Sequence, residues 1–352
     1  MDHAVISVPD THDLPRAWAD LRAAEPRLRI RDAAARLGVP EAALRATAVG
    51  ATTTRLVDDW QGVLRRAPLL GEVMALTRNE HAVHEKVGEY RTPSFTGSHG
   101  LVLGGPIDLR LFLNRWHHGF AVDEDGARSL QFFDEYGEAI HKIHAREATD
   151  RGEWDKLVAI FRADDQRPGF TPSVRPAPAP ERPDAHIDGP ALRAAWLAMR
   201  DTHEFFGLLR RLEVSRLQAM RHAPEGHARR VAVDALDRLL PVAAGLALPI
   251  MVFVGNPGCI QIHTGPVARI APMGSWINVL DPGFNLHLRR DRVDQAWVVR
   301  KPTSDGVVSS LELFDADGGT IALVFGERKP GAPELAAWRD ALDDLPDLGA
   351  TE

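Results

Sequence analysis

The chain repeats itself, and the spacing of the repeat limits what it can fold into. Asn79 and Gly88 recur 177 residues later as Asn256 and Gly265, and the segment 108–122 recurs at the same offset as 285–299. Farther along, the matches at 129–130, 133–134, 137 and 140 recur 181 residues later. The second half therefore carries a four-residue insertion, which we place within 300–308, and the repeat predicts two similar α+β units.

Short apolar runs punctuated by Gly, Pro and Asp predict a large antiparallel sheet flanked by helices in each half. The expected strands are 82–88, 100–104, 109–112, 119–122, 129–134 and 139–145, then 250–254, 260–264, 277–280, 284–288, 296–299, 309–314 and 321–325. The expected helices are 17–24, 31–37, 41–48, 57–66, 154–161, 191–220, 228–240 and 338–342, while 69–77 fits neither class.

A change of composition marks the boundary between the halves. Residues 167–190 contain seven prolines, which disfavour both helix and sheet and make a stiff, extended connector. We therefore predict a first repeat over 1–166, a linker over 167–190 and a second repeat over 191–352.

Composition narrows the class of protein. A formal charge of -7 argues against a protein built to coat nucleic acid or an anionic membrane. No run of eighteen apolar residues and no signal-peptide pattern occurs, so we expect a protein of the cytoplasm without membrane insertion. Cys259 is the only cysteine, which excludes a disulfide or a cysteine-based metal cluster within one chain.

One alternative class remains open at the N-terminus. The turn Gly38-Val39-Pro40 between two predicted helices resembles a helix-turn-helix, although helical hairpins of this kind are common structural units. A DNA-binding regulator is therefore a third reading, and the acidic chain makes nucleic acid an unexpected partner.

The stretch from Asp201 to Phe206 holds the candidate metal ligand, His203. A helical projection sets Phe205 and three leucines on one arc and His203 on the opposite side, where a core histidine would not lie. Either Asp201 caps a new helix, with Glu204 in the capping-box position and His203 in the first turn, or one helix runs on from residue 191.

The two halves differ where chemistry is expected. His203 corresponds to a position between Pro26 and Leu28, so it has no counterpart, and Lys301 falls in the insertion. This asymmetry favours one site built from both halves. Other histidine groups (His81 with His84, His117 with His118, and His141 with His144) are weaker metal candidates and fit surface or structural roles better.

Several runs are specific enough to carry a family resemblance. In the second half they are VGNPGCIQIHTG at 254–265, WINVLDP at 276–282, FNLHL at 284–288, AWVVRKPT at 296–303 and SLELFD at 310–315. In the first half they are RNE at 78–80, DLRLF at 108–112 and SLQFFD at 129–134. Nearly the whole chain thereby resembles the cytoplasmic haemin-degrading and haemin-transport proteins of bacterial haem uptake systems.

The resemblance implies one haem b held in the cleft between two duplicated halves. The family's axial histidine lies in an Asp-x-His-x-Phe-Phe pattern, which here makes His203 the iron ligand. An arginine approaches the other face of the haem, which corresponds to Arg110. The implied ring contacts are Phe112 and Phe206, and the implied propionate contacts are Arg216, Lys301 and Arg328. Ala322 and Leu323 depart from the polar or aromatic residues common there, so one propionate contact is expected to be missing.

These residue types suit haem chemically. The apolar disc gains stability by leaving water, its iron accepts neutral imidazole, and its two carboxylates need cations. Arg110 is the candidate catalytic residue, because a donor there would stabilise negative charge on oxygen that attacks the macrocycle.

Two activities stay open at this stage. Degradation would need an external electron donor, since no flavin or nicotinamide fingerprint occurs; a chaperone or storage protein would need only reversible ligation. Besides haem, the expected partners are a haem importer, a haem oxygenase or a reductase.

Overall fold

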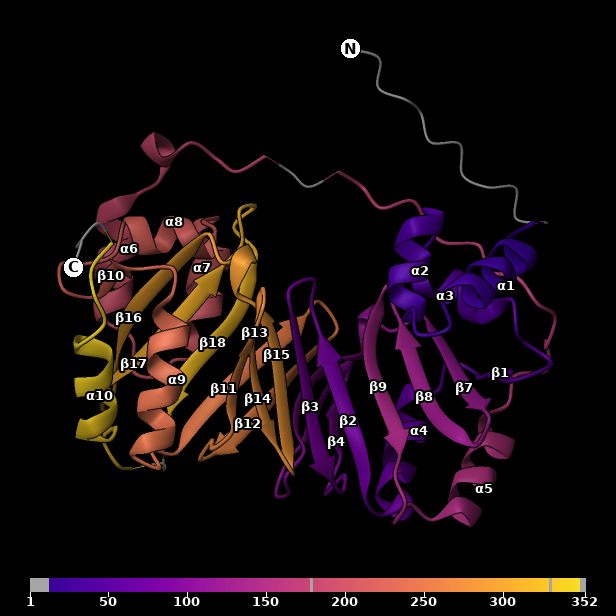
Figure 1. Ribbon diagram of the computed structural model, residues 1–352. Helices are drawn as coiled ribbons and strands as arrows, with labels where there is room; N and C mark the ends of the chain where they lie inside the picture. Colours follow the sequence, from indigo (N-terminus) through magenta and orange to yellow (C-terminus); the bar gives the residue numbers. More distant parts are fainter. Residues whose placement is uncertain (1–12, 178–179, 329–330, 349–352) are drawn as a thin grey trace. The chain divides into compact units, whose positions relative to one another are not determined.

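A computed structural model describes residues 13–177, 180–328 and 331–348. Its strands form two nine-stranded sheets, and the chain divides into two compact units (Figure 1). Unit 1 comprises Met1–Arg78, Lys86–Pro176 and Asn256–Gln261, and unit 2 comprises Asn79–Glu85, Ala177–Gly255 and Ile262–Glu352. The main division, between Pro176 and Ala177, falls inside the Pro-rich stretch.

The helices of unit 1 are α1 (Leu14–Ala24), α2 (Ile30–Leu37), α3 (Glu41–Ala46), α4 (Trp60–Arg66) and α5 (Arg151–Phe161), with 3-10 turns η1 (Ala67–Leu70) and η2 (Leu113–Arg115). Its strands are β1 (Thr53–Arg55), β2 (Val73–Arg78), β4 (Ser94–Thr96), β5 (His99–Val102), β6 (Asp108–Phe112), β7 (His118–Glu124), β8 (Ala127–Phe133) and β9 (Ala139–Ala145). A further strand, β3 (Ala82–Gly88), begins in the segment assigned to unit 2 and ends in unit 1.

Unit 1 has helices on both faces of one antiparallel ladder, in the order β1-β7-β8-β9-β2. Apolar residues of α4 and α5 pack with Leu130 and Phe132. The α3 residues Ala42 and Ala46 pack with Phe120 and Phe133 on the other face. Because successive side chains of a strand point to opposite faces, the ladder contributes to one hydrophobic cluster on each face.

The helices of unit 2 are α6 (Gly189–Leu197), α7 (Glu204–Leu212), α8 (Arg216–Arg221), α9 (Ala235–Gly245) and α10 (Ala336–Asp343), with 3-10 turns η3 (Asp184–His186) and η4 (Arg290–Arg292). Its strands are β10 (Ala228–Val231), β11 (Ile250–Asn256), β13 (Ile270–Met273), β14 (Trp276–Asp281), β15 (Phe284–Arg289), β16 (Gln295–Thr303), β17 (Gly306–Phe314) and β18 (Thr320–Gly326). Strand β12 (Cys259–Gly265) begins in unit 1 and ends in unit 2.

Unit 2 repeats this arrangement around the ladder β10-β16-β17-β18-β11. The helices α9 and α10 lie side by side and pack on the face that carries Val298 and Leu311 (Figure 1). The helices α6, α7 and α8 pack on the opposite face, which carries Trp297, Val299 and Phe314. The predicted duplicated α+β fold is therefore confirmed.

The hairpin β16–β17 shows where the two halves differ in length. Each of its strands has nine residues, whereas β7 and β8 have seven each, so the four predicted extra residues lengthen this hairpin. The sequence-based position of Lys301 inside the insertion was wrong. Lys301 pairs with Val308 at the place where Glu124 pairs with Ala127, and the extra residues lie just beyond it.

Several predicted elements need correction. The helix expected over 228–240 is strand β10 followed by α9, because residues 228–231 pair with β16 instead of continuing the helix. The stretch 191–220 is three helices, and the unassigned stretch 69–77 ends in β2. The short strands β1, β4 and β13 were not foreseen.

Two equivalent asparagines fix matching turns in the two halves. Asn79 Oδ1 accepts from the main-chain N–H groups of His81 and Ala82, and its Nδ2 donates to the carbonyl oxygens of Gly255 and Ile321. Asn256 makes the same four hydrogen bonds with Gly258, Cys259, Arg78 and Ile140. Each asparagine belongs to the unit built mainly from the other half of the chain.

The helix-turn-helix reading loses its support here. Gly38 ends α2 with a left-handed φ of 66°, as the expected turn requires. Glu41, Ala42, Ala43, Leu44 and Ala46 of α3 are all buried. A buried second helix offers no side chains to a DNA groove, so α3 is a core element.

Candidate functional site

A break between two helices of unit 2 places His203 in solvent. α6 ends at Leu197, α7 begins at Glu204, and His203 is the N-cap residue of α7. An Asp201 carboxylate oxygen accepts from the main-chain N–H of His203 at 2.8 Å and from its Nδ1 at 2.6 Å. The imidazole side chain is 86% exposed. Because Nδ1–H donates its hydrogen bond to Asp201, the lone pair of Nε2 is left for a metal.

The structure corrects both sequence-based predictions for this segment. A continuous helix from residue 191 is wrong, because α6 and α7 are separate. Asp201 as the helix cap is also wrong, since His203 holds that position and no side chain caps α7. The Asp201 carboxylate accepts hydrogen bonds from the main chain and side chain of His203 instead. These two hydrogen bonds lower the pKa of Asp201.

Two neighbouring aromatic side chains of α7 point to opposite environments. Phe205 is 2% exposed and packs edge-on against Trp196, as the predicted apolar arc requires. Phe206 is 69% exposed. A solvent-facing phenyl ring three residues after an exposed imidazole offers apolar surface to a flat ligand.

A buried carboxylate brings two of the predicted basic residues together. Glu312 is fully buried and accepts from Arg216 Nε at 2.6 Å and Nη2 at 2.9 Å. It also accepts from Lys301 Nζ at 2.6 Å and from the Ser310 hydroxyl at 3.1 Å. Lys301 is 2% exposed, whereas 24% of the Arg216 side chain is exposed. We call Arg216, Lys301 and Glu312 the cation cluster.

The cation cluster stays ionised despite its burial. Burial lowers the pKa of Lys301 to about 8, partly offset by Glu312. Burial alone would raise the pKa of Glu312, but Arg216 and Lys301 outweigh it and hold that pKa well below its usual range. Both cations also lie over the Phe205 ring, with Arg216 Cζ 5.2 Å and Lys301 Nζ 4.5 Å from its centroid.

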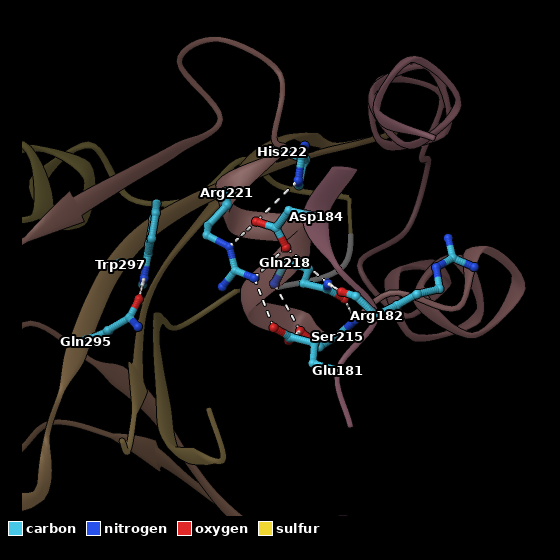
Figure 2. Close-up of polar contacts among 9 residues, drawn as sticks. All are labelled: Glu181, Arg182, Asp184, Ser215, Gln218, Arg221, His222, Gln295 and Trp297. Carbon is cyan, nitrogen blue, oxygen red and sulfur yellow. Dashed lines mark hydrogen bonds and ion pairs between the residues drawn. The ribbon is translucent and has the colours of Figure 1, made fainter. Parts of the chain in front are cut away.

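The helix that carries Arg216, α8, is also held by hydrogen bonds to Glu181 and Asp184 near the end of the predicted linker (Figure 2). Arg221 donates to Asp184 at 2.7 and 2.8 Å and to Glu181 at 3.1 Å. Gln218 donates to Asp184 at 3.1 Å, and the Ser215 hydroxyl donates to Glu181. These hydrogen bonds fix both ends of α8 and therefore the origin of the Arg216 side chain.

The remaining basic residue predicted in unit 2 lies near the histidine segment. One Arg328 Nη is 4.0 Å from the Asp305 carboxylate, and the Arg328 charge contributes to the lowered pKa of Asp201. With 24% of its side chain exposed, Arg328 is accessible. Unit 2 thus contains His203, Phe206, the cation cluster and Arg328.

The other two predicted residues belong to strand β6 of unit 1. Arg110 donates to the Asp108 carboxylate and, at 3.3 Å, to the carbonyl of Leu109. Burial is the main reason that the pKa of Asp108 is raised, while the Arg110 charge opposes the shift. Phe112 packs edge-on against His99, with ring centroids 5.9 Å apart.

Sequence reasoning missed Glu312. The signal was present in the repeat, because Ser310 and Glu312 occupy the places of Ser129 and Gln131. A neutral amide is replaced by a carboxylate on the hairpin that carries Lys301. The approach of Arg216, 96 residues away in the chain, could not be read from this spacing.

Of the weaker histidine candidates, His141 has a structural role. His141 is fully buried, with Nδ1 2.8 Å from the Thr77 hydroxyl and Nε2 2.5 Å from the Tyr90 hydroxyl. Across the described ranges, no group of three or more His, Cys, Asp or Glu residues is arranged to hold a metal ion.

Two α+β units, each with helices on both faces of an antiparallel ladder, define a duplicated protein, and its second unit exposes a histidine that is hydrogen-bonded to a carboxylate. Residues 38–161 and 213–345 match the family model described as the haemin-degrading HemS.ChuX domain. The chain belongs to this family of haem-utilisation proteins, so the predicted resemblance is confirmed.

Full-length relatives agree with this assignment. The hemin transport protein HmuS of Yersinia pestis is 40% identical over 337 residues, which cover 94% of this chain and 97% of that protein. Holo-PhuS, a haem-binding protein from Pseudomonas aeruginosa, is 47% identical, with 96% and 99% of the two chains covered and a TM-score of 0.93. The haem-degrading enzyme ChuS of Escherichia coli O157:H7 is 38% identical, with 96% and 100% covered and a TM-score of 0.88.

No helix in the described part of the chain is long and apolar enough to cross a membrane.

Proposed function

We propose that the protein binds one haem b in the bacterial cytoplasm, with His203 as the iron ligand, and degrades it to release iron. The observation that carries the proposal is the exposed imidazole whose Nδ1 donates to Asp201. Hemin transport, haem binding and haem degradation, the activities named for HmuS, PhuS and ChuS, support it.

The residues of unit 2 fit the chemistry of this ligand. Phe206 supplies apolar surface for the macrocycle, and its burial by a ligand would contribute roughly 2 kcal/mol. Arg216, Lys301 and Arg328 supply positive charge for the two propionates. Of these, Arg216 and Arg328 have partly exposed side chains, whereas Lys301 is buried against Glu312.

We further propose that residues of both halves contact the same haem. Arg110 of unit 1 would donate a hydrogen bond on the face opposite His203, and Phe112 would lie against the ring. The guanidinium has five N–H donors, and the described contacts to Asp108 and Leu109 leave donors for a ligand. Such a donor stabilises negative charge that develops during oxygen attack on the macrocycle.

The alternative is a haem chaperone or storage protein that delivers haem to a separate haem oxygenase. The transport and binding activities named for HmuS and PhuS favour it. Reversible ligation by His203 would then suffice, and Arg110 would have no role in turnover.

The two functions are separated by a turnover assay. The protein loaded with one equivalent of haemin, then given ascorbate or a reductase, oxygen and catalase, should lose its Soret band and yield a linear tetrapyrrole and free iron. Arg110→Ala should keep its haem but react at least about tenfold more slowly, because one preorganised donor to developing charge is lost.

Arg128→Ala is the matched control, since Arg128 also lies on a strand of unit 1 and also forms ion pairs, with Asp123 and Asp155. It should react at the wild-type rate. Bleaching that catalase abolishes, or that ignores Arg110→Ala, would favour the carrier.

A further inference from the structure

We propose that Glu312 is a positioning residue, which acts through Arg216 and Lys301 to hold two cations together for the carboxylates of the bound ligand. This inference rests on the proposed haem binding. Glu312 is buried and would not touch haem itself. Through the two cations, however, it would control how strongly the propionates are bound.

Geometry is the first support for this role. One carboxylate accepts from Arg216 through two nitrogens and from Lys301 and Ser310, at 2.6 to 3.1 Å. The bidentate pair fixes the plane of the guanidinium. Phe205 lies under both cations, so their side chains are packed as well as paired.

Charge balance is the second support. Two cations share one carboxylate, which leaves one surplus positive charge in the cation cluster. A ligand can reach this positive charge at the Arg216 side chain, which is partly exposed, whereas Lys301 is buried. Without Glu312, two like charges would remain in a buried place, and both would be disfavoured there.

The duplication shows that the fold does not require this carboxylate. In unit 1 the equivalent strand positions are Ser129 and Gln131, an uncharged pair joined by a hydrogen bond of 2.9 Å. Both pairs are buried on the same ladder strand of their unit. At these strand positions only the repeat that carries His203 has a carboxylate, whereas the buried carboxylate on this face of unit 1 is Glu41 of α3, which pairs with Lys142 across from Gln131.

The test compares two ligands, haemin and haemin dimethyl ester, which lacks free carboxylates. Titrated into full-length Glu312→Gln, haemin should bind about tenfold or more weakly than to the wild type, because charge-assisted bonds to the propionates are lost. The ester should bind both proteins within about twofold, since it never used those bonds. The iron ligation spectrum should be unchanged.

The matched control is Glu334→Gln. Glu334 is a buried carboxylate that accepts from Ser309, on the other face of β17, and from Arg339. This variant should bind both ligands as the wild type does. If Glu312→Gln does not fold, Glu312→Asp keeps the charge but is too short to reach both cations, and should show a smaller loss of the same kind.

The possible results separate a failure of this inference from a failure of the proposed function. Unchanged or tighter haemin binding by the folded Glu312 variants would overturn the inference, as would an equal loss for haemin and its ester. A wild-type protein that binds neither ligand would overturn the proposed function itself.

Discussion

At the scale of single residues, burial decides which histidines can meet a ligand. His203 is exposed and keeps one nitrogen for a metal, whereas His141 uses both nitrogens inside unit 1. The hydroxyls of Thr77 and Tyr90 can each donate or accept, so a neutral imidazole is fully satisfied there. His141 is therefore a structural residue, and it stabilises the folded state only while its imidazole is neutral.

This predicts a specific loss of stability in acid. Burial, followed by repulsion from His144, lowers the pKa of His141 to about 3. Since the pKa is lower in the folded state than in the unfolded chain, the stability is present above about pH 6.5 and is lost as the pH falls toward 3. Between pH 6.5 and 4 the free energy of unfolding should fall by about 3 kcal/mol from this residue alone.

His141→Gln keeps a donor and an acceptor but cannot ionise, so its free energy of unfolding should fall less steeply over that range. Denaturant titrations at a series of pH values measure the two slopes. The exposed His186→Gln should retain the wild-type slope. Equal slopes in wild type and His141→Gln would contradict the account.

At the scale of elements, the turns at Asn79 and Asn256 are the best defined. Each amide accepts two main-chain N–H bonds and donates to two carbonyls, so an aspartate of the same shape would face two carbonyl oxygens with no proton to give. Asn256→Asp should lower the free energy of unfolding by about 3 kcal/mol through the two lost bonds.

Asn79→Asp should cost a similar amount, because its four bonds are equivalent. The exposed Asn114→Asp provides the control for the added charge and should change little. Chemical unfolding of the three variants gives the comparison. A stable Asn256→Asp would show that this turn is held by the strands and not by the amide.

Helix and strand boundaries show what the sequence could and could not predict. The apolar arc of α7 follows from periodicity and places Phe205 and His203 on the correct sides. The strand β10 could not be seen, because pairing with β16 overrides the local preference of residues 228–231 for helix. The break between α6 and α7 depends on contacts around Asp201 that have no periodic signal, and the break between α7 and α8 depends on the Ser215–Gln218 capping box that starts α8.

At the scale of the whole molecule, the repeat was the most informative signal. Its constant offset predicted two units of the same architecture, and the change of offset predicted the longer hairpin of the second unit. The position of Lys301 in that hairpin needed the strand register, which places it opposite Val308. The cation cluster needed the fold, since α8 brings Arg216 to a strand far along the chain.

The central claim is that His203 holds the iron, and haemin titration of His203→Ala tests it most directly. Exposed His186 in the same unit provides the matched variant, His186→Ala. His203→Ala should lose the wild-type ligation spectrum and bind at least about tenfold more weakly, since one coordination bond is removed. Added imidazole should restore the spectrum, and His186→Ala should behave as the wild type. An unchanged spectrum and affinity in His203→Ala would contradict the account.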